Sequence, residues 1–144
     1  MYVKTNWVDD ITPISAEKMD NIENGISSLD RVMGTYVGNG AASRTISLGF
    51  TPSAVFVCDE DGSTRYGDDS RYYNGGLAVM GSPVKTGVVS TVDPVTTVNE
   101  FVLAAVTDGF MVYYTRYKRN GSYSYYNTIG TNENGKTLRY IAYK

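Results

Sequence analysis

Residues 110–129 read FMVYYTRYKRNGSYSYYNTI, and this stretch decides the fold class. At its centre stands Asn120-Gly121, a dipeptide that favours the tight turns of antiparallel hairpins. Apolar and polar side chains alternate on both sides of that turn, as they do in half-buried strands. The stretch therefore predicts a β-hairpin in which a strand at 110–118 pairs with a strand at 123–129.

Alternation with a period of two continues along the chain from Thr35 onward, and turn signals recur about every 8–12 residues. Further candidate strands lie at 44–48, 54–59, 76–80, 85–91, 100–107 and 138–143. The strands do not alternate with the helical segments that a parallel sheet would need. Residues 35–144 are therefore predicted to form one mainly β domain, an antiparallel β-sandwich.

One helix is predicted ahead of this body. Ser15 can cap its N-terminus, Glu17 lies in the first turn where the helix dipole favours a negative charge, and Gly34 ends it. Its apolar residues are spaced as in a coiled-coil seam: Met19, Ile22, Ile26, Leu29 and Met33. The helix could pack on its own domain or form a short parallel bundle between identical chains. The narrow stripe favours the bundle, so residues 1–34 are predicted to be an oligomerisation segment.

The composition narrows the range of functions. The formal net charge is -2, whereas proteins that bind nucleic acid usually carry a basic excess. The chain has no histidine and a single cysteine, Cys58, so it lacks the usual general base near neutral pH and a partner for an internal disulfide. We therefore expect no catalysis and no cofactor. The 13 tyrosines and 15 glycines instead indicate β structure with an aromatic binding surface.

Acidic residues are concentrated at 59–61 and 68–69. Oxygen-rich loops of this kind can hold calcium, but the spacing does not match an EF-hand, because Ser70 occupies the twelfth position from Asp59. Paired carboxylates could also serve a glycosidase, although nothing in the sequence indicates a carboxyl group with a raised pKa. We favour a solvated acidic loop without a metal.

The segment that follows the first acidic residues contains side chains suited to a sugar. Arginine supplies planar hydrogen bonding, and tyrosine supplies an aromatic face for C–H stacking. The candidate ligand-binding residues are Arg65, Tyr66, Arg71, Tyr72 and Tyr73. The alternative is a polar loop in which the tyrosines pack locally.

The sequence contains no segment that predicts membrane insertion. Residues 1–7 include no apolar leader, and no window approaches the ~18 consecutive apolar residues that a spanning helix needs. We therefore expect synthesis in a cytoplasm and, if the protein works outside the cell, release by lysis.

Two stretches resemble proteins of bacteriophage particles. Residues 7–23, WVDDITPISAEKMDNIE, resemble the segment that opens many tail-fibre and appendage proteins of phages infecting Gram-positive bacteria, whose pattern is W-x-x-x-x-T-P-I-x-A-x-x-L-N-x-I-E. Met19 replaces the usual leucine and Asp20 the usual asparagine. Residues 49–57, GFTPSAVFV, look like the G-F-x-P-x-A-V-x-V of the C-terminal domain of phage and prophage fibres. With 107–112 and 139–143, they resemble a trimeric H-type lectin-like sandwich.

The resemblance implies a homotrimer on a virion, joined to other virion structural proteins through its N-terminal segment. It also implies a receptor-binding role, in which the sandwich contacts a host cell-wall glycan. A capsid-decorating or head-fibre protein without a dedicated receptor site is the main alternative. A third possibility is an adhesion module on the surface of a bacterium that carries prophage-derived genes.

The predicted hairpin would have one apolar outer face. Alternation places Phe110 and Val112 inward, and it places Met111, Tyr113 and Tyr117 outward. A monomer rarely exposes such a stripe, so we assign Tyr113 and Tyr117 to the trimer interface, together with the helical seam. A ligand-binding face is the alternative for this stripe.

Overall fold

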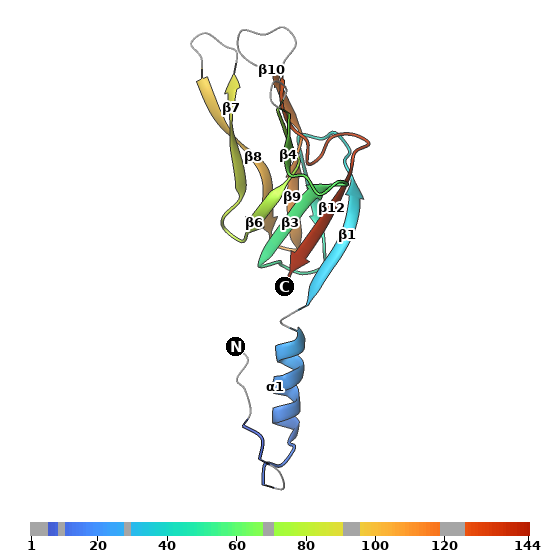
Figure 1. The fold of residues 1–144 in the computed structure, drawn as a ribbon, viewed down its shortest axis with the longest axis vertical. Coiled ribbons are helices and arrows are strands. Elements are labelled where there is room, and N and C mark those ends of the chain that lie inside the picture. The colour runs from blue at the N-terminus through green and yellow to red at the C-terminus, as the bar shows by residue number, and fades with distance from the viewer. Residues whose placement is uncertain (1–5, 9–10, 28–29, 68–70, 91–95, 119–125) are drawn as a thin grey trace.

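The computed structural model describes residues 6–8, 11–27, 30–67, 71–90, 96–118 and 126–144. These residues form a mainly β protein with one short helix at one end (Figure 1). The elements are α1 (Ala16–Ser27), β1 (Arg31–Val37), β2 (Ser43–Ser47), β3 (Ala54–Asp59), β4 (Arg65–Tyr66), β5 (Arg71–Tyr73), β6 (Gly76–Val79), β7 (Val84–Ser90), β8 (Thr96–Val106), β9 (Gly109–Tyr113), β10 (Thr115–Lys118), β11 (Tyr126–Ile129) and β12 (Thr137–Tyr143).

The helix begins where the sequence predicts it. Ser15 Oγ accepts a hydrogen bond from the Lys18 backbone N–H at 3.3 Å, which satisfies one of the N–H groups that lack a partner inside the helix. α1 buries none of its side chains: Met19 is 43% exposed and Ile26 is 62% exposed. An isolated helix of this length is marginal in water, so α1 lacks the packing that would stabilise it within one chain.

The predicted helix extends too far toward the C-terminus. α1 ends at Ser27, and both Met33 and Gly34 lie in β1, where they pair with Ile141 and Tyr140 of β12. The ladder of β1 with β12 therefore overrides the heptad spacing that includes Met33. Leu29 lies outside the described residues. Because the sheet begins at Arg31, the boundary predicted between residues 34 and 35 falls inside a strand.

Two antiparallel sheets form the body of the molecule. Their strand orders are β1-β12-β3-β6 and β2-β9-β8-β7. The two sheets pack face to face in a sandwich-like arrangement, and each contributes the side chains that alternate inward. The core consists of Tyr36, Val55, Val57, Ala78, Leu103, Ala105, Phe110, Val112, Leu138 and Ala142.

A third sheet, here called the tip sheet, lies at the end opposite α1 (Figure 1) and has the order β10-β11-β5-β4. β10 pairs antiparallel with β11, which confirms the strand pairing of the predicted hairpin, while the turn at Asn120-Gly121 lies outside the described residues. The strands of the two sandwich sheets pair antiparallel, as predicted, whereas β11 pairs with β5 in parallel within the tip sheet.

The strand predicted at 110–118 is divided between two sheets. β9 ends at Tyr113 in the sandwich, and β10 begins at Thr115 in the tip sheet. At this point the Tyr113 N–H donates to Thr131 Oγ1 at 2.9 Å, and the Tyr114 N–H donates to the Ala42 carbonyl at 3.2 Å. These two contacts replace the ladder and let the chain change sheets without leaving its N–H groups unpaired.

Candidate functional site

The tip sheet joins the two surfaces that the sequence offers as competing ligand sites. Arg65 and Tyr66 form β4, and Arg71, Tyr72 and Tyr73 form β5. β11 joins these short strands to β10 in one sheet, and β10 contains Tyr117, the last residue of the outward hairpin stripe. The five predicted ligand-binding residues and the end of the stripe are therefore neighbours on one small sheet.

The strand register divides the predicted ligand set between two faces. Residues aligned across neighbouring strands share a face, and one such row contains Arg116, Thr128, Tyr72 and Tyr66. The Tyr66 and Tyr72 rings are stacked, with centroids 4.7 Å apart and planes 10° apart. The Arg116 guanidinium lies 4.0 Å from the centroid of the Tyr126 ring. We call this side the tyrosine face.

The opposite side, here called the arginine face, contains the other three predicted residues. Arg65 aligns with Tyr73, and its guanidinium lies 5.4 Å from the centroid of that ring. Arg71 aligns with Asn127 and Tyr117. The Tyr117 hydroxyl donates to Glu100 Oε1 of β8 at 2.5 Å, and this hydrogen bond, together with burial, raises the pKa of Tyr117 to about 12.

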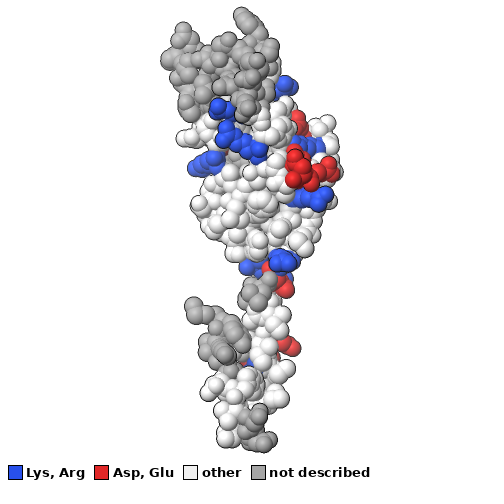
Figure 2. Space-filling model, in the orientation of Figure 1, with Lys and Arg blue, Asp and Glu red and all other residues white. Residues whose placement is uncertain are grey.

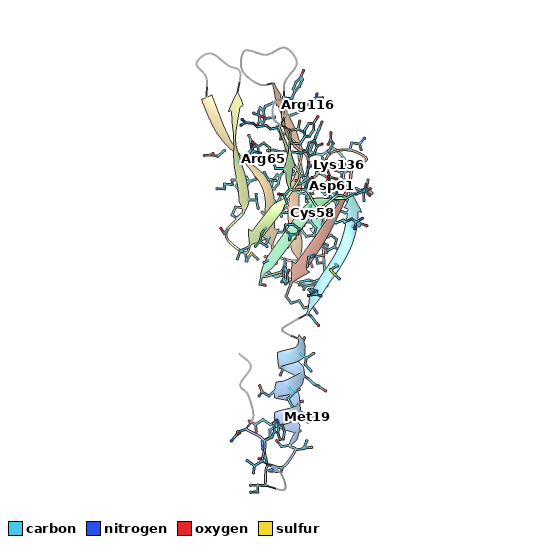
Figure 3. The ribbon with its side chains drawn as sticks, in the orientation of Figure 1. Met19, Cys58, Asp61, Arg65, Arg116 and Lys136 are labelled. Atoms are coloured by element: carbon cyan, nitrogen blue, oxygen red, sulfur yellow. The ribbon has the colours of Figure 1, made fainter. Side chains whose placement is uncertain are left out.

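The positive charges of the tip-sheet arginines are not neutralised by acidic side chains of the described residues. Among the described residues, no acidic side chain forms an ion pair with Arg65, Arg71 or Arg116. Figure 3 shows Arg65 and Arg116 at this end of the molecule, far from Met19 of α1. In Figure 2 basic side chains gather at the same end of the visible face, and acidic side chains gather to one side of them. The guanidinium groups thus keep donors available for an external acceptor.

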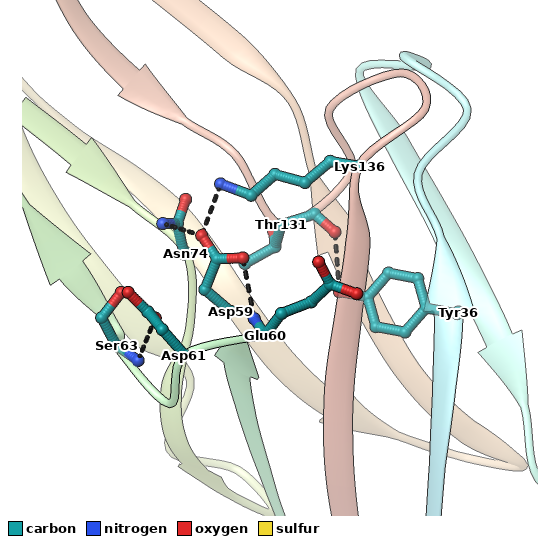
Figure 4. A network of polar contacts seen from close by, with 8 residues as sticks. All are labelled: Tyr36, Asp59, Glu60, Asp61, Ser63, Asn74, Thr131 and Lys136. Carbon is teal, nitrogen blue, oxygen red and sulfur yellow. Dashed lines mark hydrogen bonds and ion pairs between the residues drawn. The ribbon is translucent and has the colours of Figure 1, made fainter.

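A network of polar and charged contacts lies next to the tip sheet (Figure 4). Lys136 Nζ lies 2.9 Å from Asp59 Oδ2, and the same oxygen accepts a hydrogen bond from Asn74 Nδ2 at 3.0 Å. Lys136 Nζ also lies 5.3 Å from the centroid of the Tyr66 ring. Burial acts to lower the pKa of Lys136, but the hydrogen bond to Asp59 and the nearby acids outweigh it, so that pKa is raised. Lys136 therefore links the end of β3 to strand β4 through its contacts with Asp59 and with the Tyr66 ring.

Several buried polar atoms at the base of the tip sheet lack a hydrogen-bond partner. They are Ser63 Oγ, Asn74 Oδ1, Asn127 Oδ1 and Thr128 Oγ1. Thr128 lies in the row of Tyr66 and Tyr72, and Asn127 lies in the row of Arg71. A buried polar atom without a partner costs about 1–3 kcal/mol. The tip sheet and the residues next to it therefore contain buried polar atoms whose hydrogen-bonding capacity is not used within the described chain.

The acidic loop does not assemble a cation site in the part of the chain that is described. Asp59 is engaged by Lys136 and Asn74. Asp61 accepts the Ser63 N–H at 2.8 Å, and that hydrogen bond lowers its pKa. No group of three or more potential metal ligands occurs among the described residues. Asp68 and Asp69 lie outside the described residues, and the interpretation of a solvated loop without a metal stays a prediction.

The outward hairpin stripe is partly covered by side chains of its own chain. Tyr113 is half-buried and stacks on Phe101, with ring centroids 5.7 Å apart, and burial raises its pKa. Tyr117 is occupied by its hydrogen bond to Glu100. The assignment of Tyr113 and Tyr117 to a trimer interface stays a prediction.

The N-terminal motif folds back on the first turn of α1. Thr12 Oγ1 accepts the Val8 N–H at 2.9 Å, and the Thr12 N–H donates to the Val8 carbonyl at 3.0 Å. Lys18 donates to the Pro13 carbonyl at 3.1 Å, and its ammonium lies 5.6 Å from the centroid of the Trp7 ring. The tryptophan, threonine, proline and lysine of this segment thus form one local structure at the far end of the molecule.

A second surface was missed by the sequence reasoning. On the sheet β1-β12-β3-β6, the side chains that alternate away from the core are mostly apolar, and Met33, Ile141, Phe56 and Leu77 form one aligned row across all four strands. We call the surface formed by these four residues with Val79 and Tyr143 the apolar face. Met33 is 63% exposed and Leu77 is 57% exposed. The signal was present in residues 54–58, AVFVC, because an unbroken apolar run makes both faces of a strand apolar.

The apolar face is hollowed near its centre. A depression of about 390 Å³ is lined by Met33, Gly34, Thr35, Phe56, Cys58, Arg139, Tyr140 and Ile141. Cys58 is buried, and burial raises the pKa of its thiol. A raised pKa keeps the thiol protonated and unreactive near neutral pH, so Cys58 acts here as an apolar side chain.

The described residues include no helix that is long and apolar enough to cross a membrane. Comparison of the chain with models of protein families, with curated proteins and with solved structures finds no match.

Proposed function

We propose that the protein is a non-catalytic, homotrimeric fibre protein of a phage particle that contacts a host cell-surface glycan through its tip sheet. The observation that supports this most is the joining of Tyr66, Tyr72, Arg65 and Arg71 on one small sheet with guanidinium donors free of acidic partners in the described chain. On the tyrosine face, stacked rings offer flat apolar area to a sugar ring, and on the arginine face, guanidinium forks offer paired donors to hydroxyl or anionic groups.

The position of the tip sheet supports the same proposal. α1 and the N-terminal motif lie at one end of the molecule, and the tip sheet lies at the other (Figure 1). In a fibre, one end attaches to the particle and the other faces the host. We propose that residues 1–34 attach to other virion proteins and that α1 trimerises through Met19, Ile22 and Ile26. Three weak sites on one stem would then act together through their effective concentration.

Binding of the full chain to an array of bacterial cell-wall polysaccharides tests the glycan contact. Tyr72→Ala should weaken binding about tenfold if the tyrosine face makes the contact, and Arg71→Ala should do so if the arginine face does. Thr45→Ala, at an exposed position of β2 outside the tip sheet, is the control and should bind like the wild type. Normal binding by both tip-sheet variants would refute the assignment.

The position of the protein on the particle tests the virion role. Electron-microscope images of phage particles, with the protein labelled by an antibody, should show density at the tail. Density on the head would favour the capsid-decorating alternative, and the absence of label from particles would overturn the virion role.

A further inference from the structure

The apolar face has no role in the glycan contact, and we infer that it packs against further copies of the same chain. The inference concerns a surface other than the tip sheet, and it shares with the proposed function only the expectation that copies associate. Folding one chain leaves this face uncovered: Leu77 and Met33 are more than half exposed, while Val55 and Val57 on the other side of the same sheet are 0% exposed. One sheet therefore has two apolar sides, and the fold covers one of them.

The arrangement of charge on this sheet matches that of a protein interface. The row Met33, Ile141, Phe56 and Leu77 runs across its centre, while Arg139 lies in the aligned row on one side and Arg31 in the row on the other. Protein interfaces place apolar side chains at the centre and charged ones at the rim, and arginine is enriched in them. A partner of the same sequence would meet apolar side chains with its own.

The connection between α1 and β1 makes a second copy the partner that fits. Ser27 ends the helix and Arg31 begins the strand, and a chain extends by at most about 3.5 Å per residue. The C-terminal end of α1, with Ile26, is therefore held close to β1, the edge strand of the sheet whose outer side is apolar. When the helices of several chains bundle, their β1 strands come together too, and each apolar face is carried toward its neighbours.

The area available is sufficient for a stable interface. The face offers six apolar side chains, and α1 offers three more, Met19, Ile22 and Ile26. At roughly 60 Å² each, these give on the order of 500 Å² per chain. A stable interface buries about 800 Å² per partner, of which about 60% is apolar. Neither α1 nor the face alone reaches that area, so the inference requires both to be buried together.

Charged substitutions on the face test the inference in the full chain. Met33→Lys and Leu77→Lys place a charge on side chains that one folded chain leaves mostly in water, so they should leave the fold of each chain intact. Thr45→Lys, on the exposed outer side of β2, is the matched control. By sedimentation equilibrium at about 10 µM, wild type and Thr45→Lys should be oligomeric, and the two face variants should need at least about tenfold more protein to associate.

A second measurement separates dissociation from misfolding. The melting temperature of an oligomer rises with protein concentration, and that of a monomer does not. Wild type and Thr45→Lys should show this dependence, and the face variants should keep a cooperative transition that does not depend on concentration in the range where they are monomeric. Wild-type mass and wild-type concentration dependence in both face variants would overturn the inference while leaving trimerisation through α1 intact. A wild-type chain that stays monomeric at about 100 µM would overturn both the packing of the apolar face and trimerisation through α1. The polysaccharide array would still test glycan binding by the tip sheet separately.

Discussion

The ammonium group of Lys136 lies 2.9 Å from Asp59 Oδ2 and 5.3 Å from the centroid of the Tyr66 ring. One side chain from the turn before β12 thus contacts the end of β3 and the edge strand of the tip sheet. The side chains of the ion pair are 16% and 19% exposed, whereas those of the Lys144–Asp30 pair near α1 are 41% and 53% exposed. The two pairs allow a direct comparison of a sheltered and a solvated contact.

Asp59→Ala should lower the free energy of unfolding by about 1–3 kcal/mol, because it leaves both Lys136 and Asn74 without their acceptor. Asp30→Ala removes the solvated pair and should change that free energy by less than about 0.5 kcal/mol. Urea unfolding of the two variants measures both values. Equal effects would mean that the Asp59 network contributes no more than a surface ion pair.

The same network predicts how stability changes in alkali. The pKa of Lys136 is raised above its ordinary value of 10.5, so the folded state holds this proton more tightly than the unfolded state. The contribution is therefore fully present below pH 10.5 and is lost as the pH rises through the higher value of the folded state. The free-energy difference between wild type and Asp59→Ala should shrink above pH 10.5, as measured by urea unfolding across that range.

Thr131→Val should destabilise the junction between the sandwich and the tip sheet by about 1–3 kcal/mol. The Thr131 hydroxyl is buried, accepts the Tyr113 N–H at 2.9 Å and donates to the Val102 carbonyl at 2.6 Å. Valine keeps the shape of threonine but leaves that N–H and that carbonyl unpaired. Thermal unfolding measures the loss, and Thr45→Val, at an exposed position, serves as the control. Equal melting temperatures for the two variants would contradict the prediction.

Gly75→Ala should unfold or severely destabilise the protein, because a Cβ at this position would lie 1.9 Å from the Val57 carbonyl oxygen. Gly75 joins β5 of the tip sheet to β6 of the sandwich, so neither side can move away without breaking its ladder. Gly81 has a φ of +79° but open space around it, so Gly81→Ala should cost only about 1–2 kcal/mol of backbone strain. Chemical denaturation of both variants distinguishes the clash from the strain.

Glu100→Gln should lower the pKa of Tyr117. The hydrogen bond to Glu100 and burial raise this pKa from 10.0 to about 12, so the neutral phenol is favoured up to that pH. Removing the carboxylate removes its repulsion of the phenolate. Absorbance titration, with Tyr117→Phe subtracted to isolate one tyrosine among 13, should show the midpoint move toward 10. An unchanged midpoint would indicate that burial alone sets the value.

The sequence predicted those strands whose side chains carry a clear periodic signal. Residues 54–59 form β3 with the predicted bounds, and residues 138–143 lie within β12. Strand β1 was hidden, because Met33 continues the spacing of the helical seam, and its pairing with β12 depends on residues far along the chain. β4 and β5 are too short for alternation to be recognised.

The candidate ligand residues were identifiable from the sequence, but their arrangement was not. Arg65, Tyr66 and Tyr72 could be chosen by chemical type alone. Their division between two faces follows from the register of β4 with β5 and of β5 with β11. The pairing of β5 with β11 joins segments that are separated in sequence by the sandwich strands β6, β7, β8 and β9, and no local pattern specifies it.

β12 lies between β1 and β3, so the last strand of the sheet occupies an inner position. During synthesis, residues 31–37 must wait for residues 137–143 before either can pair. Until then the side chains of Met33 and Phe56 belong to separate segments, and the row that they share with Ile141 and Leu77 does not exist. If the apolar face packs against other copies, as we infer, a nascent chain does not yet offer the complete row, and this face can meet another copy only after β12 has paired with β1 and β3.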